Sequence, residues 1–285
     1  MKKFYFLMLC LLTLSVSAIA QTVKSVSSPD GNIKVDVRIG NGITYDVYCG
    51  EEKVLADCRM SMDIEGNVLG SLPKLQSVKR QKVNDVKRPF LKLKFAEVPN
   101  NYNEMTLVMK GNYSVVFRAY NDGLAYRFVT SLKGEVKVNH EDITVFFPQD
   151  AQLVLQQSDR YRTSYEERYS FVKSSEWLSF QKMAHYPVLA ITSGGTKILM
   201  SESDLCDYPA PFFRSNDANG FSSVFPRVPA VEKPRSDKSN DVLLRHPYIA
   251  KTQGTRSFPW RYFVIAKDEA ALVTNTMTCR LAQDS

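Results

Sequence analysis

The chain has 285 residues, of which 44% are hydrophobic and 24% charged, and its formal net charge is +7 at pH 7. A chain of this length buries a large core by itself, which excludes the class of small folds that depend on disulfides or metals. The densest basic stretch, Val78–Arg88, lacks interleaved stacking aromatics, so we predict a solvated strand edge there and no nucleic-acid site.

The first twenty residues have the features of a signal peptide. Lys2 and Lys3 precede the apolar run Phe4–Val16, and Ala18-Ile19-Ala20 has the small-residue pattern at which signal peptidase cuts. The run is shorter than the roughly 20 residues that a membrane-spanning helix needs. We therefore predict a cleaved signal peptide (1–20) and an exported protein, periplasmic or secreted, that has no membrane span. Loss of the two lysines lowers the charge from +7 to +5.

Short strands separated by turns follow the signal peptide. Apolar and polar residues alternate from Ile33 to Ile39, which is the period of a half-buried strand. Similar segments recur at intervals of roughly ten residues, as in sandwiches and barrels. We predict strands at 33–39, 43–49, 54–58, 60–64, 92–96 and 103–110, and a further strand that ends near Phe147.

The stretch Tyr113–Val129 predicts an aromatic β-hairpin. Apolar residues alternate on both sides of Asn121-Asp122-Gly123, which supplies turn chemistry because glycine tolerates positive φ. A hairpin this aromatic must bury one face against another sheet. The sequence therefore predicts an all-β protein.

The second half of the chain combines strands with two long polar segments. Residues 156–179 and 206–257 show little periodicity, and we predict them as long loops. Strands are predicted at 185–191, 197–201 and 260–266, and a short helix at 267–275. The four cysteines after the signal peptide (Cys49, Cys58, Cys206 and Cys279) have no zinc-site spacing, and both disulfides and free thiols stay open.

Four stretches in the chain resemble one family. They are SSPDGNIKVDV, YNEMTL followed by FRAYNDGLAYRF, SESDLCDYP, and TRSFPWRYFVI. Their order and spacing are similar to those of the N-terminal domain of glycoside hydrolase family 97, the exported α-glucosidases and α-galactosidases, over essentially all of residues 24–281. The resemblance implies one domain, 21–285, with a large super-sandwich of antiparallel sheets shaped like galactose mutarotase.

In that family the sandwich precedes a catalytic (β/α)₈ barrel, and this chain ends at Ser285, about where the barrel would begin. The resemblance places the catalytic carboxylates on the barrel, so we expect no catalytic residue here and no hydrolysis by this chain alone. It also implies an α-linked oligosaccharide as the substrate and the barrel as the partner, with the preference for glucose or galactose left open.

Within SESDLCDYP, the resemblance draws attention to Glu202. The family's matching acidic residue reaches the active site of the barrel and helps to bind Ca²⁺. The sequence places Glu202 just past the end of an apolar strand, where side chains leave the sheet. Because Ca²⁺ takes six to eight oxygen ligands, we expect it to bind only when the barrel is present. The alternative is an ordinary exposed acid.

Aromatic and charged residues also combine at 165–169, 207–209 and 256–261. The resemblance suggests that these stretches approach the mouth of the barrel, and we expect Glu166, Tyr208, Arg256 and Trp260 to contribute to substrate binding. The alternative for each is packing or an interdomain contact, and Trp260 has the features of a core or interface anchor.

Three other functions stay open. Glu202 and Asp204 could act as a catalytic pair, but neighbours on one face of a strand cannot flank a sugar from opposite sides. A mutarotase-like epimerase needs a histidine acid and a carboxylate base in one cleft, for which His140, His185 and His246 are available with Glu202. The third function is that of a stand-alone carbohydrate-binding or scaffold protein.

Overall fold

The computed structural model describes residues 21–89 and 94–283, and these residues form nineteen strands and two short helices. Seventeen of the strands belong to one continuous sheet, which folds into two facing layers. All of the strand pairs are antiparallel, and the prediction of an all-β sandwich is confirmed. The predicted signal peptide lies outside the described residues.

The first layer combines strands that follow each other in the chain with β19, which pairs with β9 and β13 from far along the sequence. In order of pairing it contains β6 (Leu75–Lys87), β7 (Val98–Met109), β8 (Tyr113–Tyr120), the start of β9 (Gly123–Phe146), β19 (Trp260–Ala266), β13 (Lys197–Ser203), β12 (Met183–Ile191), β10 (Gln152–Ser158) and β11 (Tyr169–Lys173).

The second layer begins as a meander and ends on a strand of the first. It contains β1 (Thr22–Ser27), β2 (Ile33–Ile39), β3 (Ile43–Cys49), β4 (Glu52–Ile64), the end of β9, β15 (Gly220–Val224) and β14 (Phe212–Ser215), which pairs with β12. The short β5 (Asn67–Leu69) extends β4.

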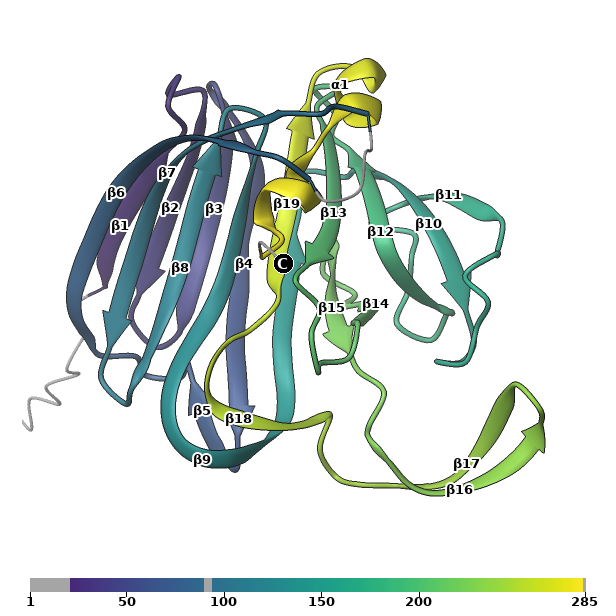
Figure 1. Ribbon diagram of the computed structural model, residues 1–285. Helices are drawn as coiled ribbons and strands as arrows, with labels where there is room; N and C mark the ends of the chain where they lie inside the picture. Colours follow the sequence, from purple (N-terminus) through teal and green to yellow (C-terminus); the bar gives the residue numbers. More distant parts are fainter. Residues whose placement is uncertain (1–20, 90–93, 284–285) are drawn as a thin grey trace, which may run out of the picture.

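The long strand β9 joins the two layers. Its start pairs with β8 and β19, its middle with β18 (Ala250–Ser257), and its end with β4 and β15. The strand bends at the bottom of the molecule in Figure 1. Gly134, in the middle of the strand, has a φ of +67° that side chains rarely adopt. One strand therefore fixes how the layers face each other.

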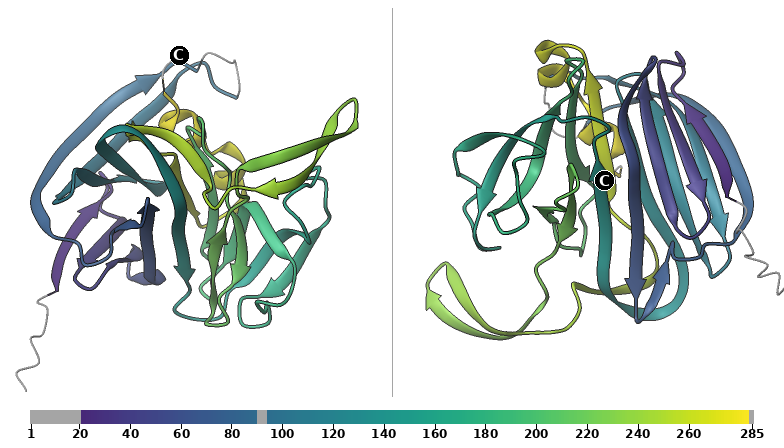
Figure 2. Two further views of the ribbon diagram at one scale, coloured as in Figure 1. Left: turned by 90° about the horizontal axis from the view of Figure 1, so that it is seen from below. Right: turned by 180° about the vertical axis from the view of Figure 1, so that it is seen from behind.

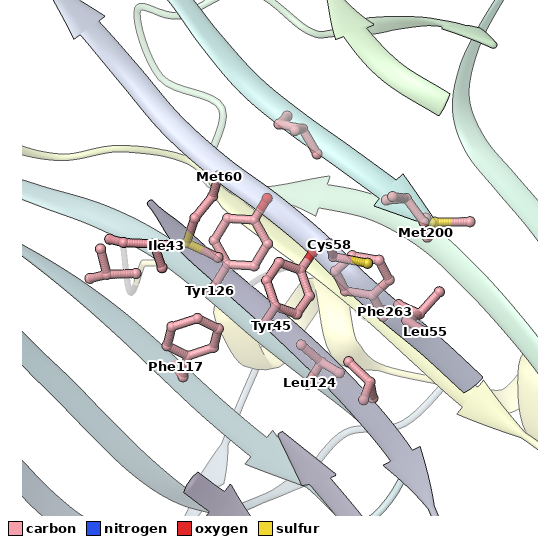
Figure 3. Close-up of a cluster of buried hydrophobic side chains, with 14 of the residues drawn as sticks. Ile43, Tyr45, Leu55, Cys58, Met60, Phe117, Leu124, Tyr126, Met200 and Phe263 are labelled. Carbon is pink, nitrogen blue, oxygen red and sulfur yellow. The ribbon is translucent and has the colours of Figure 1, made fainter. Parts of the chain in front are cut away.

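The core between the layers is aromatic at its centre. Tyr45 of β3 contacts Phe117 of β8 and Tyr126 of β9, with ring centroids 6.1 and 5.6 Å apart, and the rings of Phe117 and Tyr126 are 5.8 Å apart (Figure 3). All three side chains are at most 1% exposed. The predicted hairpin thus buries one face against the meander, as its alternation required.

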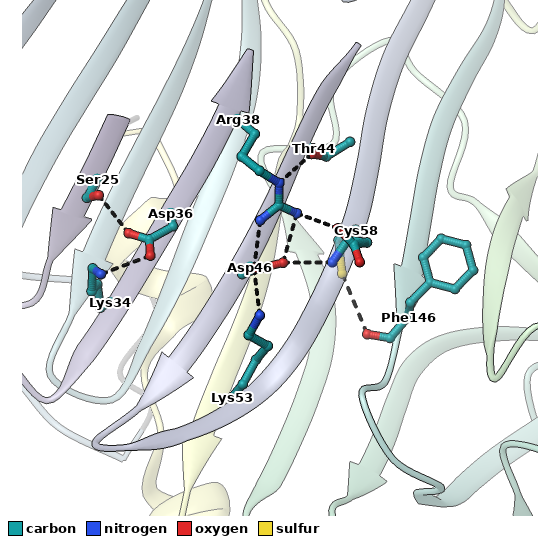
Figure 4. Close-up of polar contacts among 10 residues, drawn as sticks. Ser25, Lys34, Asp36, Arg38, Thr44, Asp46, Lys53, Cys58 and Phe146 are labelled. Carbon is teal, nitrogen blue, oxygen red and sulfur yellow. Dashed lines mark hydrogen bonds and ion pairs between the residues drawn. The ribbon is translucent and has the colours of Figure 1, made fainter. Parts of the chain in front are cut away.

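A charged cluster lies on the outer face of the meander (Figure 4). The carboxylate of buried Asp46 accepts two hydrogen bonds from Arg38, at 2.6 and 2.9 Å, and one from Lys53 at 2.9 Å. The backbone N–H of Asp57 donates a further bond at 2.8 Å. Burial alone would raise the pKa of Asp46, but these four donors lower it below its ordinary value.

Several predicted elements are wrong. Residues 206–257 contain five strands, and β10 and β11 occupy part of 156–179. The strands β16 (Pro229–Ser236) and β17 (Ser239–Arg245) pair only with each other and form an arm that leaves the sandwich, so neither face has an apolar period. Of the predicted strand 92–96, residues 94–96 are not in a strand, and 92–93 lie outside the described residues.

The C-terminal part ends in two short helices, α1 (Glu269–Thr274) and α2 (Met277–Leu281). The side chain of Asp268 caps α1 by accepting from the backbone N–H of Ala271 at 2.8 Å. Over the part of the chain that the structure describes, no helix is long and apolar enough to cross a membrane. The four cysteines are free, and two of them, Cys49 and Cys58, are buried.

Candidate functional site

Glu202 lies inside β13, one residue before the strand ends at Ser203, and not beyond the strand as the sequence suggested. It is directly opposite Arg261 of β19 in the antiparallel register. Its side chain is 12% exposed, so it lies at the margin of the core. The sheet therefore holds this carboxylate in a fixed place.

Arg261 is fully buried and binds two carboxylates. Its Nη1 donates to Oε2 of Glu202, and its Nε and Nη2 donate to the two oxygens of Glu141 at 3.0 and 2.7 Å. Glu141 comes from the end of β9 in the opposite layer and is 3% exposed. A buried triad of one cation and two anions thus crosses the sandwich.

Burial governs the charges of the triad. It raises the pKa of Glu202, and the charge of Arg261 acts in the opposite direction, whereas Glu141 adds to the rise. Burial would lower the pKa of Arg261, but the two carboxylates raise it well above its ordinary value. The guanidinium is therefore the fixed positive centre that keeps two buried acids in place.

Asp204 lies on the other side of the sheet. It follows β13 with a φ of +65° and pairs with Arg127 of β9 at 3.5 Å. Tyr126 and Arg261 are opposite each other in the register of β9 and β19 and face the core. Successive side chains of a strand point to opposite faces, so Arg127, which follows Tyr126, and Trp260, which precedes Arg261, face away from the triad. Glu202 and Asp204 consequently do not share a face, and their carboxylates do not form a catalytic pair.

Trp260 is 1% exposed and contacts two cations. The guanidinium carbons of Arg118 and Arg127 lie 4.5 and 4.2 Å from the ring centroid. The surroundings of the ring are thus supplied by the protein itself. This position agrees with a core anchor.

Tyr208 separates the triad from a groove on the surface. Its ring lies 5.9 Å from the guanidinium of Arg261 on one side, and it lines a groove of about 620 Å³ on the other. Its hydroxyl is buried, and burial and the nearby Glu141 carboxylate raise the pKa of this hydroxyl well above its ordinary value. Arg256 lies 5.8 Å from the same ring and donates to the Cys206 carbonyl at 2.8 Å.

Glu166 and the three histidines make no hydrogen bond or ion pair with the triad within the described residues. Glu166 is exposed in the loop between β10 and β11. His185 is 1% exposed, and its Nδ1 lies 3.0 Å from the Tyr186 carbonyl oxygen, whereas His140 is exposed and His246 stacks on Tyr248. Within the described residues no hydrogen bond or ion pair joins a histidine to a carboxylate, so an acid–base pair for an epimerase is not assembled.

The residues present do not make a calcium site by themselves. The described part of the chain contains no group of three or more acidic, histidine or cysteine side chains placed to hold a metal. Glu202 offers one carboxylate, and one of its oxygens already accepts from Arg261. A six- to eight-coordinate ion needs several further oxygens.

Sequence reasoning missed both Arg261 and Glu141. The available signal was a charged residue within WRYFVIA, whose other residues are apolar, because a charge in a buried strand requires a buried partner. Nothing in the sequence around Glu141 identifies it as that partner, since the two residues are 120 positions apart.

Comparison with known proteins places the fold and the site in context. Residues 26–283 match the family model for the glycosyl-hydrolase 97 N-terminal domain. The chain is 33% identical over 300 residues to a retaining alpha-galactosidase of Bacteroides thetaiotaomicron, and the match covers all of this chain and 45% of that protein. The chain thus spans less than half the length of this curated relative.

Two solved structures share the fold. A glycoside hydrolase family 97 enzyme from Pseudoalteromonas sp. strain K8, in complex with acarbose, superposes with a TM-score of 0.72 at 19% identity, covering 89% of this chain and 37% of that one. A beta-arabinopyranosidase also gives 0.72, at 20% identity, with coverage of 86% and 40%.

Proposed function

The chain belongs to the glycosyl-hydrolase 97 N-terminal family, and we propose that it is the substrate-proximal domain of an exported α-glycosidase that acts on α-linked oligosaccharides. The observation that carries this proposal is the position of Glu202, which is fixed by a buried arginine at the margin of the sandwich. A carboxylate held in this way is suited to act on a neighbouring domain, because its orientation does not depend on that domain.

The glycosidase in this proposal is of the α-galactosidase or α-glucosidase type. The 33% identity to a retaining alpha-galactosidase supports the first of these. The catalytic acid and nucleophile then belong to a (β/α)₈ barrel, since Glu202 and Asp204 face opposite sides of the sheet.

In the proposed enzyme, Glu202 supplies one ligand of a Ca²⁺ ion and the barrel supplies the others. A bound Ca²⁺ contributes positive charge that stabilises developing negative charge on the substrate. The part of this chain is to orient the carboxylate of Glu202 through Arg261, while Glu141 accepts hydrogen bonds from the other side of the same guanidinium.

Activity of the complete gene product tests the proposal. We expect hydrolysis of an aryl α-galactoside or α-glucoside that depends on Ca²⁺, and Glu202→Gln should weaken calcium dependence and activity together. Asp204→Asn is the matched control, because it removes a carboxylate two residues away on the opposite face. Equal effects of the two substitutions, or full activity of Glu202→Gln, would count against the proposal.

A further inference from the structure

The groove beside Tyr208 has a cationic rim. It lies between the base of the β16–β17 arm and the loop after β10, and its volume of about 620 Å³ is within the range of small-ligand sites. Four basic residues line it, namely Arg162, Arg227, Arg245 and Lys251, against one acidic residue, Asp207.

Two of these cations have no carboxylate partner among the residues that the structure describes. Arg162 pairs with Asp241 at 3.0 Å, and Lys251 pairs with Glu135 at 2.6 Å. In contrast, Arg245 donates to the Arg227 carbonyl at 2.5 Å, and the guanidinium groups of Arg245 and Arg227 form no ion pair with any described residue. Their positive charges act on the hydroxyl of Tyr161, whose pKa is raised by burial and lowered by Arg214, Arg245 and Arg227.

One wall of the groove is aromatic. The ring centroids of Tyr161 and Phe212 are 5.2 Å apart, and Tyr165 lies 6.3 Å from Phe212. The ring of Tyr208 lines the adjoining wall, whereas its buried hydroxyl lies beside Glu141 on the side of the triad.

We propose that this groove binds a short oligosaccharide that carries carboxylate groups, such as one built from uronic acids. The unpaired arginines bind the carboxylates, because a guanidinium matches that group in charge and geometry. The aromatic wall packs against the apolar faces of the sugar rings. The preference for an anion rests on the arginines, whereas the choice of a saccharide rests on the proposed function.

Calorimetric titration of the purified chain tests this inference with a matched pair of ligands. α-1,4-Linked digalacturonate should bind at least about tenfold more tightly than neutral α-1,4-linked galactobiose at low salt, and the difference should shrink at high salt. Arg227→Gln with Arg245→Gln should remove the difference. Arg235→Gln, a substitution on the same arm outside the groove, should leave it unchanged.

Three outcomes would overturn the inference. The first is equal binding of the two disaccharides, and the second is binding that the double variant retains. The third is equally tight binding of tetraglutamate or inorganic phosphate, which would mark a peptide site or a general anion site. If circular dichroism shows the double variant unfolded, Arg227→Gln alone replaces it. This experiment measures binding and no turnover, so a negative result would not count against the glycosidase proposal. If the glycosidase proposal were itself wrong, the preference for the charged disaccharide could still be measured.

Discussion

Arg261 and Glu202 lie opposite each other on adjacent antiparallel strands, and the buried guanidinium of Arg261 bonds the carboxylate of Glu202 while it holds Glu141 of the other layer. The arginine therefore connects the two layers at the point where the core meets the surface. Its removal leaves two acids facing each other without a counterion.

Arg261→Met should destabilise the chain by about 3–5 kcal/mol, because an uncompensated buried charge costs more than the ion pair contributes. Adding Glu141→Gln should recover part of this loss, since it removes one of the two orphaned carboxylates. Urea unfolding of the two single variants and the double variant gives the coupling free energy. A coupling near zero would show that the two residues do not act on each other.

Asp46→Asn should lower the free energy of unfolding at neutral pH by about 1.5–3 kcal/mol, the range for hydrogen bonds to charged groups. The folded pKa of Asp46 is lowered, so its contribution is present above the unfolded pKa of about 3.8 and is lost as pH falls below it. Unfolding curves of both proteins between pH 2.5 and pH 7 should therefore converge toward the acidic end. A gap that is constant with pH would contradict the assignment.

Calcium should not bind measurably to this chain alone. Titration calorimetry of the purified chain should show no site with a Kd below about 10⁻⁵ M. The described residues contain no group of three or more acidic, histidine or cysteine side chains placed to hold a metal, and Oε2 of Glu202 is engaged by Arg261. Glu202→Gln should give the same flat titration. A saturable site in the chain that this substitution abolishes would mean that the other ligands are present after all.

Trp260→Ala should act on stability. The ring is 1% exposed, so its loss should cost about 3–5 kcal/mol, as for other buried aromatic truncations. Trp260→Phe keeps a ring for Arg118 and Arg127 and should retain most of the stability. An alanine variant that unfolds at the same urea concentration but loses saccharide binding would instead establish a direct sugar contact.

The strands of the first half were predictable because each buries a single face. From Ile33 to Ile39 the buried and accessible positions alternate without exception, and so does the apolar pattern. Gly123 was predicted as a turn glycine that tolerates positive φ, and its φ is +158°. A side chain there would in addition meet the Phe263 carbonyl oxygen at 2.1 Å, so the close approach of β19 is a second reason for glycine, which the sequence did not show.

The strands at 206–257 were not predicted because they carry little hydrophobic period. β14 and β15 bury Phe212, Phe213 and Phe221 but are only four and five residues long. The buried positions of β18 are Ala250, Thr252 and Gly254, which give no hydrophobic period. All of β16 is exposed. The triad could not be predicted from the sequence, because the register that places Arg261 beside Glu202 depends on pairing between strands that are far apart in the chain.

Because β9 belongs to both layers, it also determines when folding of the sandwich can be completed. The hydroxyl of Thr130 in this strand donates to the Gly254 carbonyl, 124 residues later in the chain. The first residues of β9 pair with β8 on one side, and their other side stays unpaired until β19 is in place. Contacts this distant form slowly. A polypeptide emerging from a ribosome or a translocation pore therefore holds an incomplete sandwich until residues 260–266 have arrived, and any form that stops earlier presents β9 with open hydrogen-bonding groups to other chains.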